Sequence, residues 1–136
     1  MNNRAVENQA FLNFEQKLMP LLIETSEYSE KEKIKKQYEN AYISGRKFTG
    51  VGFFTDFIVE DKSLYLPREI NLELGRIHVD LEGTTMGAGF ILFVSNGVID
   101  TLEGYTYGED TWPKKIKKYS FKLINNDGTL TPSLRV

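Results

Sequence analysis

Apolar residues recur at three- and four-residue steps near the start of the chain. One stripe is formed by Phe11, Phe14, Leu18, Leu21 and Leu22. This spacing predicts an amphipathic helix within the segment that ends at about Asn40, with polar residues such as Glu15 largely on the other side. Pro20 lacks a backbone N–H, so it should either kink this helix or begin a second short one as its first residue.

The beginning of another helix is indicated further along the segment. Ser29 can act as an N-cap, and Glu32 follows it by three residues, which is the capping-box pattern. Lysines and glutamates then interleave from Glu30 to Glu39. This mixture favours a solvated helix face with opposite-charge pairs over a basic binding patch.

The hydrophobic period changes to that of strands after about residue 41. Apolar and polar or small residues alternate from Val51 to Val59, which predicts a strand with one face buried and the other half buried. If that second face is covered, Asp56 needs a hydrogen-bond partner, and Arg46 is the candidate. Further strands are expected at residues 41–48, 77–81 and 117–124, and residues 64–66 and 70–74 are candidates for additional short strands.

A β-hairpin is the clearest local prediction. The apolar runs Phe90–Val94 and Val98–Leu102 flank Asn96-Gly97, and both central residues of a type I′ turn need a positive φ. The turn should pair Ser95 with Val98, Val94 with Ile99 and Phe93 with Asp100. Asn126-Asp127-Gly128 is expected to turn the chain into a loose polar tail.

The order of these elements predicts the fold class. Helices come first and strands joined by tight turns follow, which is typical of an α+β protein. We expect the N-terminal helices to pack on a mostly antiparallel sheet of about five or six strands. Residues 1–136 contain no linker, repeat or low-complexity tract, so we expect a single domain. The second sheet face should stay open or form a concave surface.

Composition narrows the possible functions. The 136 residues include 17 Lys+Arg, 19 Asp+Glu, one His and no Cys, with a formal net charge of −2. The absence of Cys excludes disulfides, thiol nucleophiles and Cys-ligated metals, and a single His excludes a multi-His site. The charge balance disfavours nucleic-acid and membrane partners. We therefore expect no metal and no cofactor, and the polar N-terminal residues favour a cytoplasmic location over export.

One segment concentrates aromatic and acidic residues. It contains Glu103, Tyr105, Tyr107, Glu109, Asp110 and Trp112. It could be a binding rim, where aromatics supply contact area and acids supply specificity. It could equally be a strand end and loop whose aromatics close the edge of the core, and the residue types alone leave both interpretations open.

A second candidate site lies on the strand predicted at residues 77–81. His78, Asp80 and Glu82 alternate and therefore point to one side of the strand. Such a set could bind a cation or perform acid–base chemistry. The solvent face of an amphipathic strand is the simpler explanation, because a metal site usually takes ligands from more than one element. The glycines between Gly83 and Gly89 lack the Lys-Ser/Thr pair of a phosphate loop.

Two stretches resemble a group of small uncharacterised bacterial proteins. The first is Thr49–Thr55, and the second runs from Gly87-Ala88-Gly89-Phe90 to the Leu102–Tyr107 segment and Trp112-Pro113. The resemblance covers roughly the central half of the chain and implies a shared fold without an established activity. Some small bacterial α+β proteins are immunity or toxin-neutralising partners, which is an association only.

Together these observations favour a non-enzymatic domain that binds a protein partner or itself as a homodimer. The alternative is a ligand-binding or hydrolytic protein that uses an acidic sheet face with His78, Asp80, Glu82 and Glu103.

Overall fold

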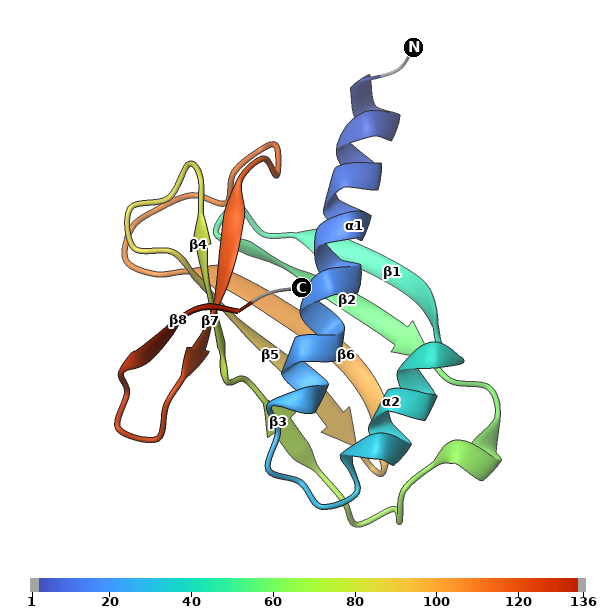
Figure 1. Ribbon diagram of the computed structural model, residues 1–136. Coiled ribbons are helices and arrows are strands. Elements are labelled where there is room, and N and C mark those ends of the chain that lie inside the picture. The colour runs from blue at the N-terminus through green and yellow to red at the C-terminus, as the bar shows by residue number, and fades with distance from the viewer. Residues whose placement is uncertain (1–2, 135–136) are drawn as a thin grey trace.

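The computed structural model describes residues 3–134, apart from the side chains of residues 3–8 and 133. Two α-helices precede the strands, which confirms the α+β class (Figure 1). The helices are α1 (Asn3–Glu24) and α2 (Lys31–Glu39). The strands are β1 (Tyr42–Phe48), β2 (Gly52–Ile58), β3 (Leu72–Leu74), β4 (Ile77–Leu81), β5 (Ala88–Ser95), β6 (Val98–Thr106), β7 (Tyr119–Ile124) and β8 (Leu130–Leu134).

All strands described belong to one antiparallel sheet. Their order is β1-β2-β6-β5-β4-β7-β8, and β3 pairs with β5 beside β4. Eight strands within residues 3–134 exceed the five or six that we expected. One reason is the segment after Asn126-Asp127-Gly128, which we expected to be a loose tail. Instead it returns along β7 as β8, so that expectation was wrong.

Helix α1 packs its apolar stripe on the sheet. Phe11, Phe14, Leu18 and Leu22 are buried, as the helical spacing predicts. The helix continues through Pro20, so the alternative of a second helix beginning there is wrong. Helix α2 begins at Lys31 after Glu30, whose side chain makes no cap hydrogen bond, so the predicted capping box is absent.

Two buried polar groups connect the helices to the strands. Gln37 of α2 donates to the carbonyls of Leu64 and Gly97, and its Oε1 accepts from the N–H of Ile99. Glu15 of α1, only 2% exposed, accepts two hydrogen bonds from Arg46 and one from Thr55.

Arg46 is therefore not the partner that we predicted for Asp56. That carboxylate accepts a hydrogen bond from Thr101 Oγ1 instead (2.9 Å).

The hairpin of β5 and β6 confirms most of the predicted register. Ser95 pairs with Val98 and Val94 pairs with Ile99. Phe93 faces Thr101 rather than Asp100, because an irregularity in the pairing follows Phe93. Residues 64–66 do not form the candidate short strand, because Leu64 is the last residue of the 3₁₀ helix η1 (Lys62–Leu64). The side chain of Asp61, just before η1, accepts a hydrogen bond from the N–H of Ser63.

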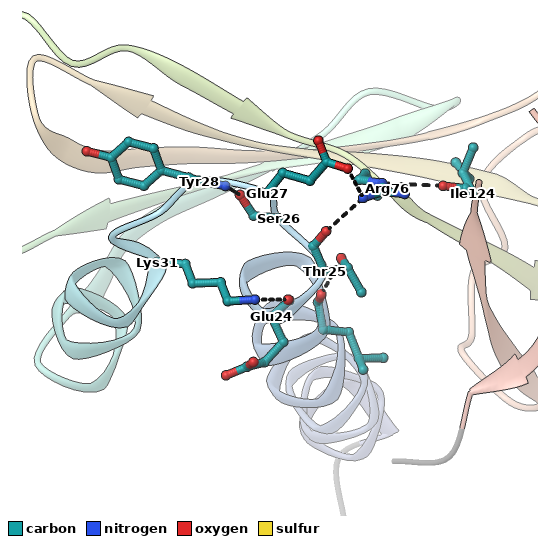
Figure 2. A network of polar contacts seen from close by, with 9 residues as sticks. Glu24, Thr25, Ser26, Glu27, Tyr28, Lys31, Arg76 and Ile124 are labelled. Carbon is teal, nitrogen blue, oxygen red and sulfur yellow. Dashed lines mark hydrogen bonds and ion pairs between the residues drawn. The ribbon is translucent and has the colours of Figure 1, made fainter. Parts of the chain in front are cut away.

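Arg76 holds a corner between β3 and β4. Its guanidinium donates to the carbonyls of Thr25 and Ile124 and forms an ion pair with Glu27 (Figure 2). The N–H of Ile124 in turn donates to the carbonyl of Arg76 (2.8 Å). The corner is therefore tied both to the end of α1 and to β7, which sets where β4 and its side chains lie.

Candidate functional site

One face of the sheet is left uncovered by the described helices. Both helices lie on the same side of the sheet (Figure 1). Side chains alternate along strands, so every second residue points to the other side. We call this other side the open face, formed by Phe54, Asp56, Ile58, Glu73, His78, Asp80, Ile91, Phe93, Thr101, Glu103, Tyr105 and Lys122.

Apolar side chains occupy the middle of the open face. Phe54 and Ile58 of β2 are 37% and 40% exposed. Ile91 and Phe93 of β5 are half-buried. Alternation on β2 predicts this half-buried second face, whereas the continuous apolar run of β5 hides which residues point outward.

Glu103 lies between two of these apolar residues. On β6 it stands opposite Phe54 on one side and opposite Ile91 on the other. Its side chain is half-buried, and within residues 3–134 it has no hydrogen bond or ion pair. A carboxylate in apolar surroundings without a partner loses favourable hydration whenever further surface covers it.

Two tyrosines and a histidine gather at one end of the open face. The rings of Tyr105 and Tyr107 meet edge to face with centroids 5.6 Å apart. The ring of Tyr107 also stacks on His78 at 5.8 Å. The absence of a side chain at Gly89 makes this possible, because a Cβ there would lie 2.5 Å from the Tyr107 hydroxyl oxygen.

His78 belongs to a second contact group with Asp80 and Lys122. Nε2 of His78 lies 2.9 Å from Oδ1 of Asp80, and Nζ of Lys122 lies 2.5 Å from Oδ2. The hydrogen bond from Lys122, followed by that from His78, holds the pKa of Asp80 below its ordinary value. An ionised carboxylate only accepts hydrogen bonds, so Nε2 of His78 carries the hydrogen of this bond.

Tyr107 is a poor acid in this environment. Burial and the neighbouring Tyr105 raise the pKa of Tyr107 to about 12. Burial is the larger of the two effects, and Tyr105 contributes through its charge and through a hydrogen bond. Tyr107 therefore keeps its hydroxyl proton at neutral pH and contributes a neutral, amphipathic ring to the open face.

The structure brings some residues of the two candidate sites together and places the others apart. Tyr105, Tyr107, His78 and Asp80 come together, although they belong to different segments of the sequence. Trp112 lies in the core at 8% exposure, with its ring against Phe53 and Phe90. Trp112 therefore closes the edge of the core, which is the second of the two interpretations that the sequence left open for this segment.

The remaining acids of the predicted sites have other positions. Asp110 accepts from the N–H groups of Thr85 and Met86, which fixes the connection between β4 and β5. Glu109 is exposed. Glu82 and Asp80 line a shallow depression of about 490 Å³ with Thr84, Lys118 and Ser120.

This arrangement offers contact area and hydrogen-bonding groups rather than a metal cage. In the part of the chain that the structure describes, no three His, Asp or Glu side chains are grouped to hold a metal ion. Nor does any helix of that part combine the length and apolar character needed to cross a membrane. No protein family, curated protein or solved structure matches this chain.

Proposed function

We propose that the protein binds a protein partner through the open face. The observation that carries the proposal is a row of outward apolar and aromatic side chains on the sheet face that neither helix covers. Phe54, Ile58, Ile91 and Tyr105 supply contact area, and polar groups surround them. Contiguous exposed apolar surface with a polar rim is typical of interaction sites.

A second candidate function is acid–base chemistry on a bound ligand. The observation that favours it is the contact between His78 and Asp80, because a carboxylate orients the ring of a general base. The depression beside Asp80 is shallow and open to solvent, which supports this candidate less than a deep pocket would.

Capture from the lysate of the source cells tests the partner proposal. Wild-type protein is compared with Phe54→Asp, which places a charge on the open face. Tyr65→Asp is the matched control, because Tyr65 follows η1 and is also 37% exposed. Thermal unfolding checks that each variant is folded, and Ile58→Asp replaces Phe54→Asp if the latter fails to fold.

The proposal predicts a partner retained by wild type and by Tyr65→Asp but lost from the open-face variant. A partner retained equally by all three folded proteins would place the binding surface elsewhere. The absence of any partner would shift attention to a ligand screen around His78 and Asp80.

A further inference from the structure

We propose that the partner places a cationic side chain, Arg or Lys, against Glu103. This inference rests on the proposed function of the open face and specifies the chemistry of the occupant. It also distinguishes between a foreign partner and a second copy of the chain.

The position of Glu103 carries the inference. The carboxylate lies between Phe54 and Ile91 in one row across three strands, at the middle of the apolar surface. A purely apolar partner would cover it and leave a buried charge without a counter-charge, which is costly. A cation at the same position would form a charge-assisted hydrogen bond in a partly desolvated setting.

Two other acids of the open face already have partners. Asp56 accepts from Thr101, and Asp80 is bound by Lys122 and His78. Lys47 on β1 is the nearest cation in the row of Glu103, but Phe54 separates the two, and no ion pair joins them within residues 3–134. Among the described residues, Glu103 and Glu73 are thus the open-face acids available to a partner, and Glu103 is the one that lies between two apolar side chains.

Glu73 adds negative charge to the open face. It stands opposite Phe93 on the neighbouring strand β3 and is exposed. A cationic partner would be steered by both carboxylates, which raises its association rate at low ionic strength.

The same geometry disfavours a homodimer through this face. A twofold axis brings equivalent residues of two copies near each other when it passes through the patch. A dimer centred on Glu103 would therefore bring the Glu103 carboxylates of the two copies together across an apolar contact. Charge complementarity instead favours a partner of opposite sign.

Peptide selection tests this inference without knowledge of the natural partner. A displayed library of random 12-residue peptides is selected on wild-type protein and counter-selected on folded Phe54→Ala. Enriched peptides are then synthesised, and their affinities are measured by fluorescence anisotropy. Glu103→Gln removes the charge and keeps the shape, and Glu109→Gln is the control, because Glu109 is an exposed acid outside the open face.

We expect enriched peptides to combine Arg or Lys with apolar residues and to lose at least tenfold in affinity with Glu103→Gln, but less than twofold with Glu109→Gln. Peptides that need Phe54 yet lack basic residues, or that bind Glu103→Gln equally well, would overturn the cationic contact and leave the proposed function intact. Failure to select any peptide that depends on Phe54 would contradict the proposed function itself.

Discussion

At the scale of single residues, Asp80 shows how the open face keeps its charges in place. It is about half exposed, and yet it binds Lys122 and His78 from two strands. Exposed ion pairs contribute little to stability because water screens them and long side chains lose freedom. The value of this contact lies in the fixed orientation that it gives to His78, which in turn stacks on Tyr107.

The first prediction concerns the pH dependence of this contact. The pKa of Asp80 is lowered in the folded state, so its contribution to stability is complete above the ordinary value of 3.8 and is lost as the pH falls through the lowered value. Asp80→Asn should therefore reduce the free energy of unfolding by at most about 1 kcal/mol at pH 6 and by a smaller amount at about pH 3, below the ordinary pKa.

Urea unfolding of both proteins at the two pH values measures this difference. Lys122→Met should reproduce the loss at pH 6, because it removes the principal hydrogen bond to the carboxylate. An equal loss at both pH values would show that Asp80 acts through packing rather than through its charge.

At the scale of elements, buried polar groups position the helices in addition to apolar packing. Gln37 is completely buried and connects α2 through three hydrogen bonds, two to the β5–β6 hairpin at Gly97 and Ile99 and one to the Leu64 carbonyl of η1. Leaving a buried donor or acceptor unpaired costs about 1–3 kcal/mol. Helix α2, only nine residues long, therefore depends on this side chain for its place on the sheet.

We predict that Gln37→Leu lowers the free energy of unfolding by about 2–4 kcal/mol, since it leaves the Ile99 N–H and the Leu64 carbonyl without their partner. Gln16→Leu is the control on an exposed position of α1 and should change stability by less than about 0.5 kcal/mol. Chemical denaturation followed by circular dichroism measures both. A change below 0.5 kcal/mol for Gln37→Leu would mean that apolar packing alone holds α2.

Elements with strong local signals were predictable from the sequence. Asn96-Gly97 determines the hairpin through backbone conformation, and Asn96 indeed has a φ of 54°. Alternation along β2 predicts both of its faces. The strand β8 has no comparable signal, because it gains its hydrogen bonds only by returning along β7.

The candidate site was predictable only in part. Alternation placed His78 and Asp80 on one side of a strand, but Lys122 and Tyr107 reach them through pairings between distant segments. For the same reason, Glu15 differs from expectation, and the sequence left the choice between rim and core open for Trp112. Their burial depends on which elements pack together, and residue type cannot specify that.

At the scale of the whole molecule, the two faces of the sheet differ in what covers them. The helices bury one face around a core that includes Phe14, Phe53 and Phe90. The other carries half-exposed Ile91 and Tyr105 beside Glu103, which has no partner among the described residues. Our central claim is that this second face is a binding surface. A toxin-neutralising role would be one instance of such binding, and it stays a prediction.

Methyl NMR of the isoleucines tests the central claim most directly. The partner retained in the capture experiment is added to protein labelled at the isoleucine δ1-methyl groups. We predict that the signals of Ile58 and Ile91 on the open face shift, while those of the core residue Ile34 and of half-buried Ile70 and Ile116 stay in place. Shifts at Ile34, Ile70 or Ile116 with Ile58 and Ile91 unchanged would contradict binding through the open face.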